Sequence, residues 1–170
     1  EYDPPKLLLG ETFVDRVAQI IPYYGAGDEL GLAFNIPFLK SAFAPDALRA
    51  AVAETEASMP DGCSPVWTGS NHDVSRFPTR WAGGDRDRTR VALMMLLTLR
   101  GAAFLYYGDE LEMPDTDVPV DRMLDPVTIA LHPVLDRDAA RTPMPWGPGP
   151  GAGFTEPAVE PWLPFGMIEG

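Results

Sequence analysis

Residues 66–77 read VWTGSNHDVSRF, and this stretch decides how the rest of the chain is interpreted. It begins as a short apolar run and ends in a polar cluster, in which Asn71, His72 and Asp73 are adjacent and Arg76 follows three positions later. A parallel strand that carries a carboxylate and an imidazole at its C-terminal end is typical of an active site. The alternative is an Asx-type turn after a strand, in which the polar side chains satisfy only nearby backbone.

The composition indicates one domain of ordinary size with a neutral partner. The chain has 170 residues, 45% of them hydrophobic, and a formal net charge of -12, and this length allows a sizeable buried core. Because no basic cluster is present, we expect neither nucleic acid nor a membrane as a partner, and a neutral polar substrate fits better. No apolar run reaches membrane-spanning length. The single Cys63 excludes an internal disulfide and a multi-cysteine zinc site, and it favours a reducing, cytoplasmic compartment.

Apolar runs alternate with helical patterns along the first 110 residues. The stretch 6–13 is expected to contain a buried strand that ends at Gly10-Glu11. Further buried strands are expected at 32–37, 65–70 and 102–107. Helices are expected at 15–21, 45–58 and 86–100. Pro22 is expected to stop the first helix. Pro45 suits the first turn of the second helix, Asp85 is the expected N-cap of the third, and Gly101 is expected to follow its end.

The repeated strand–helix order predicts an α/β fold with a parallel sheet and right-handed crossovers. Four strands are visible in the sequence, whereas a closed barrel of eight units typically needs about 250 residues. We therefore expect a partial (β/α)8 TIM barrel of about four βα units, followed by a C-terminal segment rich in loops. Trp67 is expected to pack in its core.

The segment 112–126 is expected to be an acidic loop, because it contains several prolines and no sustained apolar period. Its aspartates at positions 115, 117, 121 and 125 suggest a calcium site. However, the segment lacks the central glycine and the closing glutamate of an EF-hand loop. We therefore expect a solvated loop and no metal. His132, which precedes Pro133, is expected on the surface.

Two carboxylates are expected at the ends of alternate strands. Glu11 ends the first expected strand, and Asp73 follows the third, 62 residues later (73 minus 11). This separation is roughly two strand–helix units of about 30 residues each. In a closed barrel, alternate strands contribute side chains to the same layer. The spacing therefore predicts that Glu11 and Asp73 share one pocket rim, and Asp109 and Glu110, after the next strand, are weaker candidates.

Four motifs occur in a fixed order along the chain: LGET at 9–12, GSNHD at 69–73, YGDE at 107–110 and RDAARTPMPW at 137–146. Together they resemble glycoside hydrolase family thirteen, the α-amylase superfamily. The last motif is similar to the branch that contains α-glucosidases, oligo-1,6-glucosidases, trehalose synthases and sucrose isomerases. Pro145 departs from that branch, which usually carries glutamine there. The resemblance covers nearly the whole chain and implies that it is the C-terminal half of the catalytic barrel.

The resemblance implies two catalytic residues. Glu11 matches the general acid/base, and Asp73 matches the carboxylate that stabilises the transition state and holds sugar hydroxyls. Cleavage with retention also needs a second carboxylate that attacks the anomeric carbon. In the family this nucleophile ends the fourth barrel strand, which would precede Glu1. We therefore expect that the chain cannot turn over substrate by itself.

The resemblance also implies a set of substrate-binding residues. His72 matches a histidine that binds sugar hydroxyls, and Asn71 belongs to the same triplet. Arg141 is expected to reach the terminal glucose, with Arg137 as a rival for that role. Arg76 is expected either to contact substrate or to pair with a loop aspartate.

The expected function is that of a retaining glycoside hydrolase that cleaves α-glucosidic bonds of short oligosaccharides without a cofactor. One alternative is a transglycosylase or isomerase such as a trehalose synthase, and the other is a non-enzymatic relative that binds sugar. Residues 1–146 are expected to form the barrel half, and residues 147–170 a Gly/Pro-rich segment leading toward a C-terminal domain. The sequence does not predict the oligomeric state.

Overall fold

The computed structural model describes residues 3–4 and 6–166, so predictions that concern residues 1, 2, 5 and 167–170 lie outside the described residues. The chain divides into two compact units. One consists of Glu1–Thr68 and Met95–Phe104, and the other of Gly69–Met94 and Leu105–Gly170. The boundary expected between residues 146 and 147 stays a prediction.

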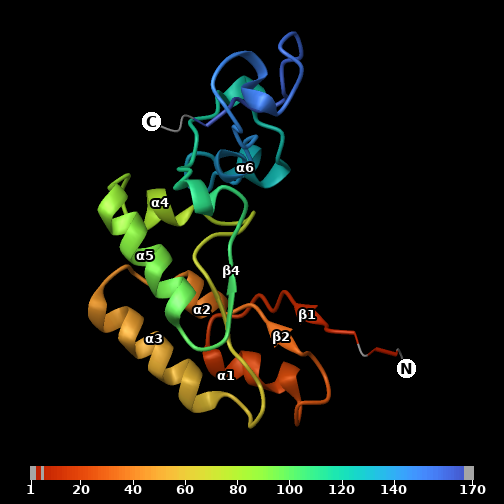
Figure 1. Ribbon diagram of the computed structural model, residues 1–170, viewed down its shortest axis with the longest axis vertical. Helices are drawn as coiled ribbons and strands as arrows, with labels where there is room; N and C mark the ends of the chain where they lie inside the picture. The colour runs from red at the N-terminus through yellow and green to blue at the C-terminus, as the bar shows by residue number, and fades with distance from the viewer. Residues whose placement is uncertain (1–2, 5, 167–170) are drawn as a thin grey trace. The chain divides into compact units, whose positions relative to one another are not determined.

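The first unit contains the parallel strands of the described residues. β1 (Leu9–Gly10) pairs with β2 (Leu32–Ala33), and β3 (Val66–Thr68) pairs with β4 (Ala102–Phe104) (Figure 1). A parallel bridge between Phe34 and Val66 connects the two pairs. The strands therefore follow one another in space in their chain order, which is the order of a β/α barrel.

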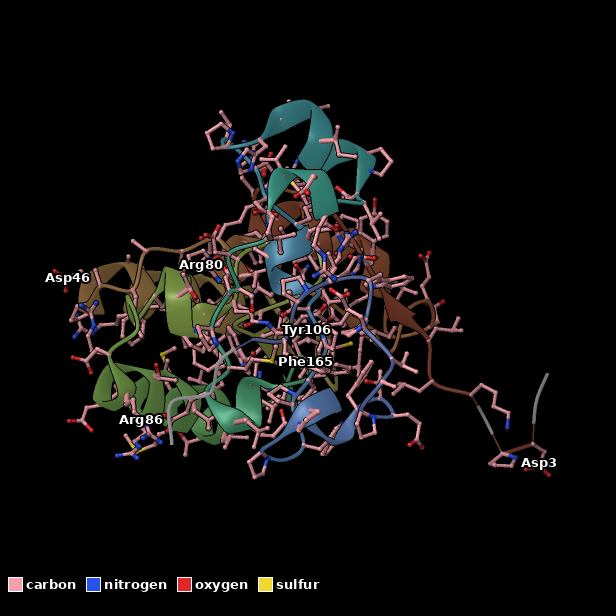
Figure 2. All side chains as sticks on the ribbon, turned by 90° about the horizontal axis from the view of Figure 1, so that it is seen from above. Asp3, Asp46, Arg80, Arg86, Tyr106 and Phe165 are labelled. Carbon is pink, nitrogen blue, oxygen red and sulfur yellow. The ribbon has the colours of Figure 1, made fainter. Side chains whose placement is uncertain are left out.

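Helices follow the strands, as the sequence predicts. The first unit contains α1 (Val17–Ile20), η1 (Ile21–Tyr24), α2 (Ile36–Leu39) and α3 (Pro45–Ser58). α3 has the predicted bounds and packs against α1 and α2. Its first turn contains Pro45 and Asp46, and Figure 2 shows the Asp46 side chain pointing outward. An acidic side chain in the first turn complements the helix dipole.

Trp67 on β3 lies in the core of the first unit, which confirms the prediction from the sequence. Its side chain has no exposed surface. The indole packs edge-on against Phe38, with 4.9 Å between ring centroids, and its Nε1 donates a hydrogen bond to the carbonyl of Arg100 at 2.7 Å. A buried indole N–H needs such an acceptor. The contact ties β3 to the residues that lead into β4.

Several predicted element bounds are wrong. The first strand ends at Gly10, as expected, but it begins only at Leu9, and Leu7 and Leu8 are 68% and 59% exposed rather than buried. The physical reason is that β1 pairs with β2 alone among the described strands, so it is an edge strand. The second strand does not reach Pro37, because Asn35 accepts a hydrogen bond from the Phe38 N–H and caps α2 there.

The first helix was expected to stop before Pro22, and α1 does end at Ile20. The chain then continues into the 3-10 helix η1, whose first turn contains Pro22. Pro is tolerated at the start of a helical segment because its missing N–H would have no partner there. The last strand ends at Phe104 rather than at residue 107.

The second unit is helical and rich in loops. It contains α4 (Phe77–Arg80), η2 (Asp109–Leu111), η3 (Val120–Arg122), α6 (Pro126–Leu131), η4 (Asp138–Ala140) and η5 (Pro150–Gly153). α5 (Arg86–Thr98) has residues in both units. Asp85 caps α5 as predicted, since its Oδ1 accepts a hydrogen bond from the Arg88 N–H. His132 is exposed at the end of α6, also as predicted. Among the described helices, none has the length and apolar character required to cross a bilayer.

Gly101 is the position where a side chain should be least tolerated. Its φ is +123°, and an added Cβ would lie 2.3 Å from the Pro65 carbonyl oxygen. That oxygen also accepts the Ala102 N–H at 2.9 Å, next to the pairing of β3 with β4. We expect Gly101→Ala to lower the free energy of unfolding by about 1–3 kcal/mol or more, measured by urea denaturation.

Gly62→Ala is the matched control for this change. Gly62 has a φ of +79°, but no atom lies within 4 Å of its added Cβ. The control therefore introduces backbone strain without a clash. If Gly62→Ala destabilises the protein as much as Gly101→Ala, the contact with Pro65 is not the cause.

Candidate active site

The turn after β3 presents His72 and Asp73. Asn71 Oδ1 accepts hydrogen bonds from the N–H groups of Asp73 and Val74, at 2.9 and 3.0 Å. This is the Asx turn that the sequence left open as an alternative to an active site. The turn and the site are compatible, because these two bonds from Asn71 engage backbone N–H groups and not the side chains of His72 and Asp73. His72 is exposed, and its Nε2 lies 3.5 Å from Asp73 Oδ2.

Two arginines hold the Asp73 carboxylate. Arg137 Nη1 lies 3.0 Å from Asp73 Oδ1, and Arg141 Nη2 lies 3.2 Å from the same oxygen. Arg141 Nε also donates a hydrogen bond to the carbonyl of His72 at 2.8 Å. Both rivals from the sequence analysis therefore reach the predicted catalytic aspartate. The Asp73 side chain remains 22% exposed, so part of it is accessible.

Asp125 is a second carboxylate that pairs with both arginines. Its Oδ1 accepts hydrogen bonds from Arg137 Nη2 at 2.7 Å and from Arg141 Nη1 at 3.1 Å. Its Oδ2 caps α6 by accepting the Thr128 N–H at 2.8 Å. Burial alone would raise the pKa of Asp125, but the Thr128 N–H and the two guanidinium groups outweigh it and lower this pKa to about 2.

Asp138 positions Asp125 in turn. Its Oδ2 accepts the N–H groups of Leu124 and Asp125, at 2.7 and 2.9 Å. The η4 turn that contains Asp138 lies between Arg137 and Arg141 in the sequence. One short helical turn thus spaces the two arginines and fixes their acidic partner.

Arg76 is fully buried behind the turn. Its guanidinium carbon lies 4.8 Å from the Tyr106 ring centroid and 4.6 Å from that of Tyr107, and its Nη1 donates to the Tyr107 carbonyl. Its backbone N–H donates to Asp115 Oδ1 at 2.8 Å, and the Ser75 hydroxyl donates to Asp115 Oδ2. Asp115 therefore holds the chain at Ser75 and Arg76, and the Arg76 side chain anchors it to Tyr107. A direct contact between Arg76 and substrate stays a prediction.

Asp109 is a second buried charged residue behind the turn that presents Asp73. It has no exposed surface, and its Oδ2 accepts the Tyr106 N–H at 2.9 Å. Burial raises the pKa of Asp109 to about 6, although hydrogen bonds from Ser70 and Tyr106 and the charge of Arg76 act in the opposite direction. Asp109 was expected as a weaker catalytic candidate; the structure shows it buried against the Tyr106 backbone, and a catalytic role stays a prediction.

Glu11 lies in the first unit and is described there. It follows β1 and is exposed. Gly10 before it accepts the Phe34 N–H at 3.0 Å, and Thr12 after it donates its hydroxyl to the Phe34 carbonyl at 3.3 Å. These bonds hold the backbone on both sides of Glu11 against the end of β2. Its predicted proximity to Asp73, and the catalytic and binding roles of the predicted residues, stay predictions.

Asp125 and Asp138 were not predicted as site residues. Asp125 was considered only as part of a calcium loop, yet the sequence Asp125-Pro126 is a signal for a helix start, with an N-cap followed by proline at N1. That signal would have indicated a fixed aspartate close to the motif that contains the two arginines. Asp138 carried no separate signal, since only the folded backbone brings its carboxylate to residues 124 and 125.

Asp125→Asn is expected to destabilise the second unit in a pH-dependent way. The folded-state pKa of Asp125 is depressed to about 2, so its stabilising contribution is present above its unfolded pKa of about 4 and is lost as the pH falls toward 2. The difference in unfolding free energy between wild type and variant should therefore be largest at neutral pH and shrink below pH 4. Denaturant unfolding at pH 7, 5 and 3 measures it, and a constant difference contradicts the assignment.

Parallel strands that neighbour one another in chain order, with helices between them and a polar cluster in the turn after a strand, are features of β/α-barrel proteins. The comparisons with known proteins give the family. Residues 1–167 match the family described as "Alpha amylase, catalytic domain", and the chain belongs to it.

Three known proteins are similar to the chain. It is 31% identical over 148 residues to a probable alpha-glucosidase of Rhizobium meliloti (strain 1021), covering 84% of this chain and 26% of that protein. It is 32% identical over 170 residues to maltase A1 of Drosophila melanogaster, covering 94% and 28%. The crystal structure of the alpha-glucosyl transfer enzyme XgtA is similar with a TM-score of 0.82 and 36% identity, covering 94% and 30%. The chain thus spans less than a third of each of these proteins.

Proposed function

We propose that this chain carries the acid/base part of a site that cleaves α-glucosidic bonds of short oligosaccharides. The main support is the Asp73 carboxylate, which two arginines hold at the exposed turn that follows β3. Glu11 at the end of β1 is a second carboxylate in a corresponding chain position. The family, together with relatives that are an alpha-glucosidase and a maltase, supports the same reaction.

In the proposed reaction, Glu11 donates a proton to the glycosidic oxygen while another carboxylate attacks the anomeric carbon and forms a covalent glycosyl-enzyme. Glu11 then takes a proton from water, and the water releases the sugar. Asp73 offsets the positive charge that develops on the sugar ring and holds hydroxyls more tightly as the ring distorts. His72 and Arg141 assist this binding. The attacking carboxylate belongs, in this proposal, to a part of the barrel outside these 170 residues, which supply about its last four βα units.

An assay of the isolated chain tests whether the attacking carboxylate lies outside these 170 residues. We expect it to release no 4-nitrophenol from 4-nitrophenyl α-glucoside above the level of its own Glu11→Gln variant, because the attacking carboxylate is missing. The full-length protein, assayed in parallel, is expected to hydrolyse the same substrate. Turnover by the isolated chain contradicts the missing nucleophile, whereas an inactive full-length protein on every α-glucoside contradicts the proposed function.

Transglycosylation or isomerisation is the second candidate, because one similar structure is described as an alpha-glucosyl transfer enzyme. These reactions use the same carboxylates and differ in which acceptor reaches the intermediate. Product analysis of the full-length protein with maltose, isomaltose, sucrose and trehalose separates them from hydrolysis. Glucose as the main product supports the glucosidase, and new disaccharides support transfer.

The third candidate is a sugar-binding relative without activity. The presence of both Glu11 and Asp73 speaks against it. We also propose a small oligosaccharide as the partner and a cytoplasmic location, which the single free thiol of Cys63 supports. Cell fractionation with an antibody against the chain tests the location.

A further inference from the structure

Asp115 lies in the loop between η2 and η3, and the reaction described above does not use it. It was expected in a solvated loop, but the residue is partly buried. Its Oδ1 accepts the Arg76 N–H at 2.8 Å, and its Oδ2 accepts the Ser75 hydroxyl. Its own N–H donates to Thr79 Oγ1 at 2.8 Å. Asp115 therefore contacts the residues that follow the Asp73 turn and lead into α4.

Thr116, the next residue, contacts the segment that contains the two arginines. Its N–H donates to the Ala139 carbonyl at 3.0 Å, and its hydroxyl lies 3.1 Å from Thr142 Oγ1. Ala139 lies in η4, and Thr142, which directly follows Arg141, has no exposed surface. Two adjacent residues of one loop thus contact both the turn that presents Asp73 and the arginine segment.

Hydrogen bonds from α4 hold the turn that presents Asp73 as one body. Arg80 donates from Nε to the Ser75 carbonyl at 3.2 Å and from Nη2 to the Gly69 carbonyl at 2.6 Å, so it connects both ends of the turn. The Asn71 side chain bonds to backbone N–H groups inside the turn. These bonds fix the shape of the turn, but they do not fix where the turn lies relative to the arginine segment.

The contacts of Asp115 and Thr116 close a ring that fixes this position. Each step of the ring is a hydrogen bond, an ion pair, or one or two positions along the chain. Its members, in order, are Asp73, Arg141, Thr142, Thr116, Asp115 and Ser75. Catalytic groups must be held within about 0.5 Å of their productive geometry by the residues around them. Opening the ring at Asp115 should therefore displace Asp73 relative to Arg141.

We propose that Asp115 is a positioning residue, which sets the place of the Asp73 carboxylate through its bonds to Ser75 and Arg76. The inference deepens the proposed function and rests on it for the reaction that Asp73 assists. Asp115 itself touches no substrate in this proposal. It acts as a pair of hydrogen-bond acceptors, one for a backbone N–H and one for a hydroxyl, rather than as a charge.

Asp115→Ala in the 170-residue chain tests the positioning without requiring activity. The Arg141 Nε–H donates to the His72 carbonyl at 2.8 Å, so its exchange with solvent, measured by NMR, reports whether the turn and the arginine remain in place. We expect this exchange to become about tenfold faster in the variant. The Thr89 N–H, which donates to the Asp85 carbonyl at 3.0 Å in the same unit, is the internal reference and should keep its rate.

Three further variants separate hydrogen bonding from charge. Asp115→Asn removes the charge but can keep both bonds, because its amide oxygen accepts the Arg76 N–H and its amide nitrogen donates to the Ser75 hydroxyl. It should retain most of the protection from exchange. Thr116→Val opens the ring at its other side-chain contact and should also accelerate the exchange, which keeps the test open if Asp115→Ala does not fold. Asp117→Ala is the matched control, because Asp117 is an exposed aspartate of the same loop.

Kinetics of the full-length protein test the consequence for the reaction. Asp115→Ala is expected to lower kcat for maltose about 10–10²-fold with a smaller change in KM, because Asp73 acts mainly in the transition state. Asp115→Asn should retain most of kcat. A purely structural role would lower only the fraction of active enzyme, so kcat is expressed per active site, counted with a covalent inhibitor.

The outcomes separate this inference from the proposed function. A full-length protein that is inactive on every α-glucoside, with faster Arg141 exchange in Asp115→Ala, contradicts the reaction alone. An Arg141 rate that is unchanged in both Asp115→Ala and Thr116→Val overturns the positioning, as does an equal acceleration at Thr89. A loss in Asp115→Asn as large as that in Asp115→Ala assigns the effect to charge and also overturns it, and so does an unchanged kcat in Asp115→Ala of an active full-length protein.

Discussion

Glu11→Gln in the full-length protein is expected to lower kcat for maltose by about 10²–10⁴-fold. Glutamine has nearly the shape of glutamate but cannot give a proton to the departing oxygen, nor take one from water. The residue lies at the end of β1, where bonds from Phe34 and Thr12 hold the backbone on both sides, so the substitution should leave the local structure intact. Steady-state kinetics, with unfolding curves to verify stability, measure the effect.

The leaving group tells acid catalysis apart from a general loss of function. An aryl α-glucoside whose phenol is a stable anion needs less protonation, so its first step should be much less impaired than that of maltose. Azide, which attacks without giving up a proton, should partly restore turnover and form glucosyl azide. Glu29→Gln is the matched control, because Glu29 is an exposed glutamate of the same unit in the loop before β2. Equal losses for both substrates, with no azide rescue, would falsify the role of Glu11.

The sequence predicts the order of elements better than their length. The α3 helix was predicted at its observed bounds, because Pro45 and the helical spacing of its apolar residues agree. Strand lengths failed, since a run such as LLLG at 7–10 is apolar whether or not both faces are covered. Only the pairing shows that β1 has one strand neighbour among the described residues and that Leu7 and Leu8 are exposed.

In the candidate site, the sequence likewise reveals the adjacent residues but not the contacts between distant segments. A motif in the chain can reveal Asn71, His72 and Asp73 together, because they are adjacent. It cannot reveal that Arg137 and Arg141 both contact Asp73 and also share Asp125. The two arginines follow Asp73 by more than 60 residues in the sequence. Arg76 illustrates the limit most clearly. Its place beside the triplet left substrate contact and pairing with a loop aspartate both open, and only the folded chain shows that it is buried against the rings of Tyr106 and Tyr107.

Arg76→Met is expected to have the largest effect on stability, a loss of about 3–5 kcal/mol in the free energy of unfolding. The guanidinium has no exposed surface, and its carbon lies 4.8 and 4.6 Å from the ring centroids of the neighbouring Tyr106 and Tyr107. Methionine fills part of this space but removes the hydrogen bond to the Tyr107 carbonyl and the positive charge that faces Asp109. Without that charge, the buried carboxylate of Asp109 loses one of the interactions that favour its ionised form. Urea unfolding of the chain at pH 7 measures the loss.

A double-mutant cycle with Asp109→Asn isolates the pair. If the two side chains interact, the double variant should be more stable than the sum of the single losses predicts, by about 0.5–3 kcal/mol. The pH dependence of the unfolding free energy is an independent test of the pair. Burial raises the pKa of Asp109 to about 6, so between about pH 4 and pH 6 the folded state retains a proton that the unfolded state loses. The wild type therefore loses stability as the pH rises through this range. Asparagine does not titrate, so the stability of Asp109→Asn relative to wild type should increase over the same window. Without Arg76 the charge that favours the ionised carboxylate is gone, and the window should extend above pH 6 in Arg76→Met. Additive single losses, or a pH profile that Asp109→Asn leaves unchanged, mean that the turn presenting Asp73 does not depend on this pair.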